Sequence, residues 1–284
     1  MEWMNDEQLE YGVIDAHVHV YTDAIADRVT ESLGERFGNP PAFKASVDGC
    51  REFSLESGVT VSLNLPVATT LDQVEKINSW ALRVNREADA EPAGRPCVRS
   101  LASYHPDVAD IPGFVDAIAK AGFAGVKLHA EYQTFTLDER RMEGFWEEMA
   151  DRGLVVYFHA GGERVFQPPF RTHPRDFLEL HRRFPKLRMV LAHLGGFGMW
   201  DEAEAVLCGE DIALDLAHVF GWTETAQILR MIRKHGPGRI LFGSDAPWQD
   251  PGRVLKALRA LPLNPADLRR IEFQNAAELF GFQG

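Results

Sequence analysis

The chain has 284 residues and a mass of 31.9 kDa, and its 45% hydrophobic and 10% aromatic content can form a sizeable core. A formal net charge of -12 argues against binding to nucleic acid or to an anionic membrane surface, because both need a basic footprint. No apolar run reaches the roughly 20 residues of a membrane span, residues 1–10 resemble no export signal, and the three cysteines form no CxxC pair, so we expect a cytoplasmic protein.

Short apolar runs with β-type composition recur along the chain. In order, they are Val13–His19, Val59–Leu65, Cys97–Tyr104, Gly125–His129, Leu154–His159, Leu187–His193, Ile212–Ala217 and Arg239–Gly243. They start about 25 to 45 residues apart, which is the room that a parallel crossover through a helix requires. The series predicts an α/β fold, a (β/α)8 TIM barrel, formed by residues 1–284 as one domain.

The segments between these runs show helical signals. Apolar residues recur at helical spacing at Leu71, Val74, Ile77, Ala81 and Leu82, and again at Met142, Phe145, Trp146 and Met149. Glycines at 122, 153, 209 and 236 stand where a helix would end before the next strand. Asn264 and Pro265 are typical of a helix start, and we expect a last helix from there through Leu279. By contrast, we expect long loops over Tyr21–Pro41 after the first run and over Gly161–Pro174 after the fifth.

Polar residues alternate with apolar ones in the first run. Asp15, His17 and His19 therefore share one face of the expected strand. An isolated pair of histidines at this spacing is more often structural than metal-binding. The other runs change that interpretation.

His159, His193 and Asp245 stand at the ends of later runs. Taken singly, each has an ordinary explanation as a hydrogen-bonded core histidine or a turn-forming aspartate. In a barrel, however, the C-terminal ends of all strands meet at one face. A carboxylate sheltered among four imidazoles costs several kcal/mol unless a partner satisfies all of them, and one divalent cation does so. The pattern predicts a metal site.

These motifs, in this order, resemble those of the amidohydrolase superfamily. The resemblance rests on His17-Val-His19, Gly125-Val-Lys-Leu-His129, His159-Ala-Gly161, Leu191-Ala-His-Leu-Gly-Gly196 and Phe242-Gly-Ser-Asp-Ala-Pro-Trp248. It is strongest to the branch of small TIM-barrel hydrolases and aminocarboxymuconate-semialdehyde-decarboxylase-like enzymes. Ala130 departs from the proline that often follows such a Gly-Val-Lys-Leu-His stretch.

The resemblance implies a metal held by His17, His19, His159 and Asp245, with His193 assisting the chemistry. Nitrogen and oxygen ligands suit zinc, which we expect first, and also manganese or iron. Such a set leaves a position for a water molecule, whose pKa falls on the metal. Asp245 would then act as a proton acceptor as well as a ligand, so the expected catalytic residues are Asp245 and His193.

Lys127 and His129 share a strand face near the position where other branches of the superfamily hold a metal-bridging carboxylated lysine. A carboxylated Lys127 would bring a second metal ion, with His193 as its ligand. We favour an unmodified Lys127 that binds a substrate anion or an acidic neighbour. His129, Arg164 and Trp248 are further candidates for substrate binding, and weaker ones are Arg171, His105, Tyr132, His218 and Trp200.

Three functions are compatible with these residues. The leading expectation is a hydrolase that uses metal-activated water on a small ester, lactone or amide, with a carboxylate on the substrate for Arg164 or Arg171 to bind. The alternatives are a non-oxidative decarboxylase on the same scaffold and a barrel that binds metal without turnover. The expected partner is a small-molecule substrate, and whether the chain forms a homodimer is left open.

Overall fold

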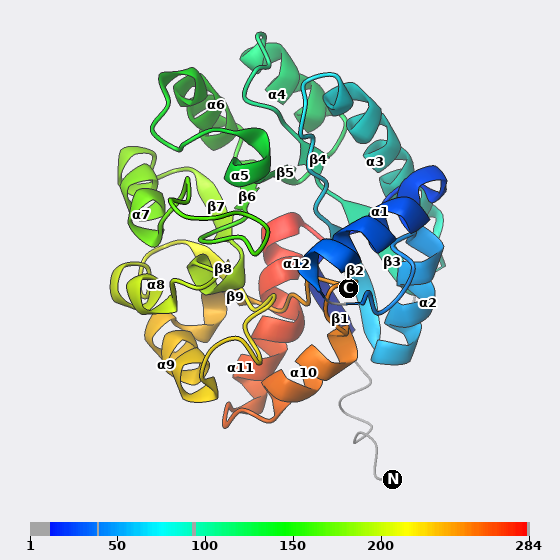
Figure 1. Cartoon of the computed structure of the whole chain (residues 1–284), viewed down its shortest axis with the longest axis vertical. Helices are drawn as coiled ribbons and strands as arrows, with labels where there is room; N and C mark the ends of the chain where they lie inside the picture. Colours follow the sequence, from blue (N-terminus) through cyan, green and yellow to red (C-terminus); the bar gives the residue numbers. More distant parts are fainter. Residues whose placement is uncertain (1–11, 39, 93–94, 283–284) are drawn as a thin grey trace.

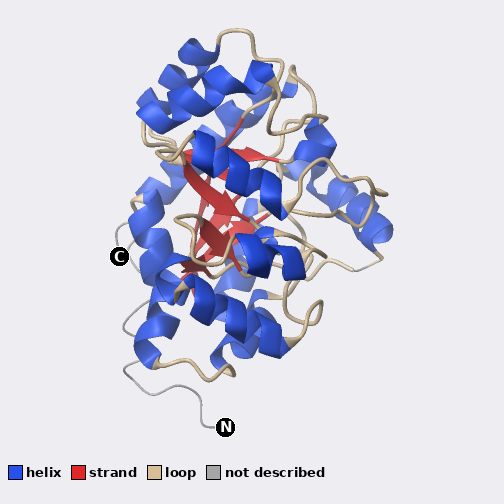
Figure 2. Ribbon diagram, turned by 90° about the vertical axis from the view of Figure 1, so that its left-hand side faces the viewer, coloured by secondary structure: helices blue, strands red, loops and turns tan. Residues whose placement is uncertain are grey.

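The strands lie at the centre of the molecule and the helices surround them (Figures 1 and 2). This computed structural model describes residues 12–38, 40–92 and 95–282. The strands within that part of the chain are β1 (Val13–Val18), β2 (Val59–Asn64), β3 (Cys97–Ser100), β4 (Ala102–Ser103), β5 (Gly125–Leu128), β6 (Val155–Phe158), β7 (Arg188–Leu191), β8 (Ala213–Asp215) and β9 (Ile240–Leu241).

All strand pairs are parallel and follow the order of the chain. β3 and β4 together make up one strand of the barrel, with a break at Leu101. The backbone N–H of Leu101 still donates a hydrogen bond to Asn64 O at 3.1 Å. The ring closes between β9 and β1, where Ala16 N donates to Phe242 O at 2.9 Å. The predicted (β/α)8 barrel is therefore confirmed.

Helices cover the outside of the barrel. They are α1 (Asp23–Phe37), α2 (Val47–Ser57), α3 (Gln73–Ala90), α4 (Ile111–Lys120), α5 (Ala130–Gln133), α6 (Arg140–Asp151), α7 (Pro174–Arg183), α8 (Trp200–Val206), α9 (Thr225–His235), α10 (Pro251–Arg259), α11 (Pro265–Arg269) and α12 (Asn275–Phe280). The short turns of helix are η2 (His193–Gly195), η3 (Pro237–Arg239) and η4 (Arg270–Gln274).

Only part of the apolar stripe predicted for α3 is buried: Val74 and Ala81 are buried, whereas Leu71 precedes the helix and is exposed. The whole stripe of α6 is buried, and its Trp146 lies 5.7 Å from Phe158 of β6, measured between ring centroids. A second buried cluster packs Ala276 and Phe280 of α12 against strand residues such as Ile14. The glycines at 122, 153, 209 and 236 all have the predicted positive φ, between 62° and 106°. Among the described residues, no helix is both long and apolar enough to cross a membrane.

Two expectations about connections need correction. The segment after the first strand, expected as a loop over Tyr21–Pro41, contains the 15-residue helix α1. Ile25, Val29 and Leu33 recur there at helical spacing. The last helix begins at Asn264 as predicted, but a π-type turn at η4 divides it. This turn lets the Ile271 carbonyl accept a hydrogen bond from Phe242 N at 2.9 Å.

Candidate active site

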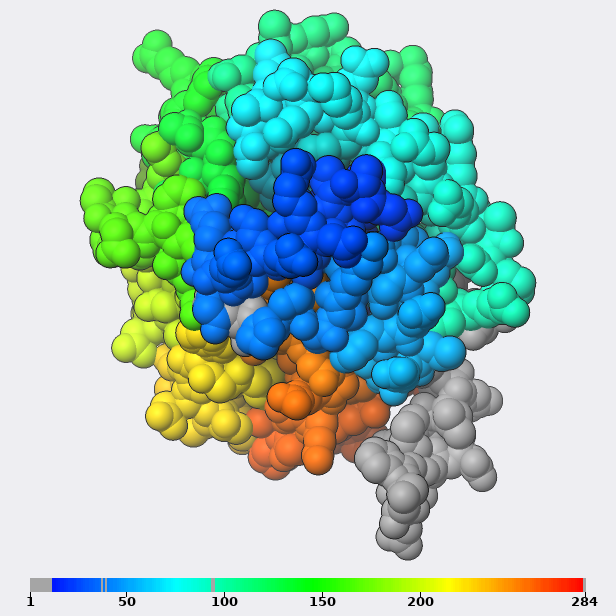
Figure 3. Space-filling model, turned by 45° about the vertical axis from the view of Figure 1, so that its right-hand side comes forward, coloured from blue at the N-terminus to red at the C-terminus, as the bar shows by residue number. Residues whose placement is uncertain are grey.

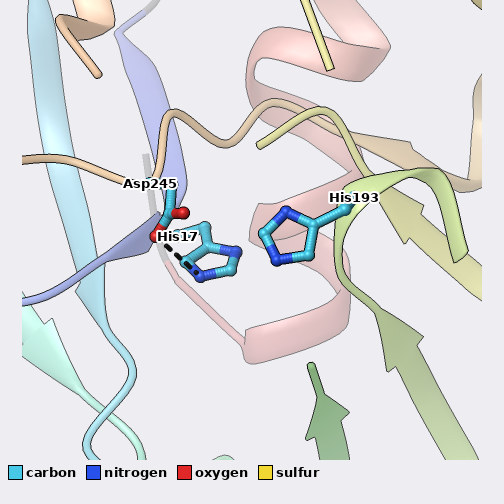
Figure 4. A group of neighbouring side chains, drawn as sticks. All are labelled: His17, His193 and Asp245. Carbon is cyan, nitrogen blue, oxygen red and sulfur yellow. Dashed lines mark ion pairs between the residues drawn. The ribbon is translucent and has the colours of Figure 1, made fainter. Parts of the chain in front are cut away.

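Two histidines and one aspartate meet where β1 and β9 end. The Nε2 atoms of His17 and His19 are 3.2 Å apart. Asp245 Oδ1 lies 3.3 Å from His17 Nε2 and 3.0 Å from His19 Nε2, and Figure 4 shows the first of these pairs. The backbone N–H of Asp245 donates to His17 O at 2.8 Å. Closure of the barrel thus brings together residues from opposite ends of the chain.

The other two histidines contact each other across the same space. His193 Nε2 and His159 Nδ1 are 3.1 Å apart. The second ring nitrogen of His193, Nδ1, donates to Ala217 O at 2.9 Å, and that of His159, Nε2, donates to Gly162 O at 2.9 Å. In neutral rings, the two facing nitrogens therefore both present lone pairs. Such a contact requires a cation or a proton between or beside them.

A proton is the less favourable choice. Burial, opposed by the nearby carboxylates, lowers the pKa of His17 to about 4. Burial also lowers the pKa of His159 and of His193. Neutral imidazoles are the form that binds metals. Ligand-capable atoms of His17, His193 and Asp245 lie within 4.8 Å of one another, and Figure 4 shows the two rings and the carboxylate converging. The residues fit a divalent cation.

Asp215 holds these ligands in position from behind. Its Oδ2 accepts from His17 Nδ1 at 2.7 Å and from the Tyr157 hydroxyl at 2.6 Å, and its Oδ1 accepts from His193 N at 2.7 Å. Burial alone would raise the pKa of Asp215, but the adjacent His17 and these hydrogen bonds lower it to about 2. A carboxylate behind a histidine fixes its tautomer and its ring orientation, which is the usual arrangement at metal sites.

The backbone is strained where these side chains leave the strands. His193, His218 and Asp245 have positive φ values of 59°, 51° and 65°, in the region that residues other than glycine seldom adopt. Asp245 Oδ2 also accepts from His218 Nδ1 at 2.6 Å. Backbone strain of this kind clusters at functional sites, where the surrounding structure enforces it.

Lys127 and its neighbours form another wall of the site. Lys127 is 1% exposed, its Nζ has no hydrogen-bond partner within the described residues, and it lies 5.0 Å from the Tyr157 ring centroid. Burial lowers its pKa to about 8. His129 stacks on His159 with ring centroids 4.0 Å apart, and its Nε2 lies 3.3 Å from Glu163 Oε2. Its Nδ1, like the Tyr132 hydroxyl, has no partner in the part of the chain that is described.

A cavity of about 570 Å³ is lined by the five ligand-type side chains His17, His19, His159, His193 and Asp245 and by Glu163. Of the predicted substrate-binding residues, Lys127, His129, Arg164 and Trp248 line it, together with Tyr132 and His218. Arg164 lies 4.7 Å over the exposed Trp222 ring.

Three weaker candidates have other contacts and do not line this cavity. Arg171 lies near Glu131, with Nε 3.8 Å from its Oε2. The His105 ring accepts a hydrogen bond from Asp107 N, and Trp200 Nε1 donates to His193 O at 3.0 Å. The expectation that Arg171 binds substrate is therefore not supported.

The sequence analysis missed Asp215 and Glu163. Asp215 could have been found, because it is the one carboxylate in the otherwise apolar Ile212–Ala217 segment and its burial needs a partner. Glu163 lies in the loop after β6, where no periodicity marks which side chains turn inward.

Comparison with known proteins identifies the family. The amidohydrolase family model matches residues 14–282, so this chain belongs to the amidohydrolase family. No curated protein matched it.

Solved structures with the same fold share little sequence with this chain. 5-Carboxyvanillate decarboxylase from Sphingomonas paucimobilis is 16% identical with a TM-score of 0.73, covering 96% of this chain and 99% of its own. Dihydroxybenzoic acid decarboxylase from Polaromonas, with bound manganese, is 15% identical with a TM-score of 0.70, covering 95% and 97%. An uncharacterised TIM-barrel protein from Bordetella bronchiseptica is 18% identical with a TM-score of 0.75, covering 94% and 97%.

Proposed function

We propose that this protein is a metal-dependent decarboxylase that removes carbon dioxide from a small carboxylic acid without oxidation. The observation that carries the proposal is the buried ammonium group of Lys127, which makes no hydrogen bond to any described residue and lines the same cavity as the histidine and aspartate cluster. Burying an ammonium group without hydrogen-bond acceptors is costly, and the carboxylate of a substrate would supply such acceptors. The similar structures named as decarboxylases support the same choice over the hydrolase expected first.

The proposed metal is a single divalent ion bound by His17, His19, His159 and Asp245. When bound, it would supply Lewis-acid charge to an oxygen of the substrate. The manganese in the Polaromonas structure makes manganese a candidate equal to zinc, and a nitrogen and oxygen ligand set accepts either.

The chain's own groups account for the rest of the reaction. Lys127 would bind the acid, and the apolar part of the cavity would exclude water from it. When the bond between the carboxylate carbon and its neighbour breaks, the electron pair stays on the neighbouring carbon, and a proton takes the place of carbon dioxide. The hydrogen-bonded pair of Asp245 and His218 holds a proton at the cavity wall, and His193 lies beside them.

Hydrolysis is the second candidate, since the same ligand set leaves room for water and Asp245 could accept its proton. To separate the two, metal-loaded enzyme is screened against aromatic and enoic acids and against lactones, esters and amides, in ¹⁸O-labelled water. Stoichiometric carbon dioxide, with no heavy oxygen in the remaining product, is the result we expect. Heavy oxygen in the product without carbon dioxide would overturn the proposal in favour of hydrolysis. Asp245→Asn is the matched inactive control.

A further inference from the structure

Besides the polar cluster, apolar side chains from two helices line the cavity. They are Ile25, Val29 and Leu33 of α1 and Ile77 and Trp80 of α3. We call these five residues the apolar annex. Figure 3 shows α1, in dark blue, on the surface beside the cyan region that contains α3.

The α1 side of the annex is a continuous apolar wall. Ile25, Val29 and Leu33 stand four residues apart, so they form one stripe that runs about 12 Å along the helix. All three are only half-buried, whereas Ala26 and Thr30 on the adjoining face are fully buried against the protein. The stripe therefore borders the cavity, and it would be covered by whatever occupies the annex.

The α3 side of the apolar annex is also apolar. Ile77 and Trp80 are three residues apart and are also half-buried. Gln73 and Lys76, one turn earlier on α3, line the cavity as well and are the polar end of this wall. Apolar side chains from both helices thus line the part of the cavity that the metal-ligand cluster does not line.

The size of the cavity indicates how large a ligand it would hold. Its volume of about 570 Å³ lies within the roughly 300–1,000 Å³ typical of sites for drug-sized ligands. A single carboxylated ring at the cluster would leave the apolar annex in contact with water. Apolar walls gain stability when an apolar group displaces that water.

We propose that the substrate is an acid with two distinct ends: a carboxylate end at the metal-ligand cluster and an extended apolar substituent in the annex. This inference rests on the proposed function only for the chemistry at the carboxylate end of the substrate. Each buried methylene contributes enough to tighten binding by about fourfold. A substituent of four carbons would therefore improve affinity on the order of 10²-fold.

The test uses benzoate, 4-butylbenzoate and 4-hexylbenzoate as probes, with calorimetric titration of the metal-loaded enzyme. We expect affinity to rise from benzoate to the butyl compound by about 10²-fold and to rise further with hexyl. Val29→Asp should abolish most of that gain, measured as the ratio of the affinities for 4-butylbenzoate and benzoate within the same variant. Ser32→Asp is the matched control, because it adds the same charge to the exposed face of α1. Ile77→Asn provides a second variant on the opposite wall.

Circular dichroism and metal content establish that each variant is folded before its affinities are compared. Equal affinity for the three probes, or none measurable up to their solubility limits, would overturn the inference. An increase of affinity with chain length that persists in both Val29→Asp and Ile77→Asn would also overturn the inference. These are binding measurements, so they test this inference separately from the proposed reaction. If affinity depends on chain length but no acid releases carbon dioxide, the proposed decarboxylase reaction is wrong and the binding role of the apolar annex still stands.

Discussion

The carboxylate of Asp215 shows how one residue organises the site. It accepts hydrogen bonds from His17, from the Tyr157 hydroxyl and from the backbone N–H groups of His193 and Ala217. These groups come from separate strands or from the turns that follow them. A neutral amide could not replace this carboxylate, because the amide nitrogen is a donor and would face the donors that surround Asp215.

Replacing Asp215 by Asn should therefore weaken metal binding. The loss of the negative charge behind His17 lowers the basicity of that ligand and loosens its orientation, and we expect the metal Kd to rise by 10- to 100-fold. Competition with a chelator of known affinity measures this change. Tyr157→Phe is the control, since it removes a neighbouring hydrogen bond to Asp215 and leaves the one from His17. A metal Kd unchanged in Asp215→Asn would show that the carboxylate has only a structural role.

At this scale, the sequence predicted the residues that end a strand. His159 and His193 end apolar runs and Asp245 follows one by two residues, and the parallel barrel brings such positions to one face. Asp215 was missed because it lies within a run. The contacts of Arg171 could not be predicted either, because the path of the loop after β6 depends on packing between distant segments.

The elements themselves were largely predictable, because a parallel barrel strand is buried on both faces and reads as a short apolar run. Each predicted strand has a counterpart, and the observed strands are one to three residues shorter, at one or both ends, when β3 and β4 are counted as one strand. The helix α1 was missed because the buried Thr30 and Gly34 interrupt its hydrophobic pattern. The π-type turn at η4 depends on tertiary contacts: Asn275 donates to Pro237 O and Ile240 O, each at 2.7 Å.

A buried histidine joins the end of α9 to the segment before β8. His235 is 1% exposed, its Nε2 donates to Ile212 O at 2.8 Å, and its Nδ1 accepts from Gly209 N at 3.3 Å. Burial lowers its pKa to about 4, from 6.5 in an exposed histidine. As the pH falls from 6.5 towards 4, the unfolded chain therefore binds a proton that the folded chain does not. The free energy of unfolding should decrease over this window.

His235→Gln should reduce this dependence on pH, because the amide can still donate and accept but does not titrate. Between pH 7 and pH 5, the free energy of unfolding of the variant should fall by about 2 kcal/mol less than that of the wild type. Urea denaturation of both proteins at the two pH values, with a chelator present, measures the difference. Equal losses in the two proteins would contradict the assigned role of His235.

At the scale of the whole molecule, closure of the barrel creates the site. β1 and β9 lie at the two ends of the strand order, and their pairing places His17 beside Asp245. The remaining histidines lie at the ends of β6 and β7, so the candidate metal position is surrounded on several sides by imidazoles and one carboxylate. The proposed reaction requires a divalent cation at that point.

Metal content is the measurement that tests this claim most directly. Purified protein, loaded with manganese or zinc and then desalted, should carry about one divalent ion per chain by mass spectrometry, and His17→Ala and Asp245→Ala should each lose most of it. Arg171→Ala is the control outside the cavity and should keep its metal. Protein that is folded and retains no metal after loading, or full occupancy in both ligand variants, would contradict the account.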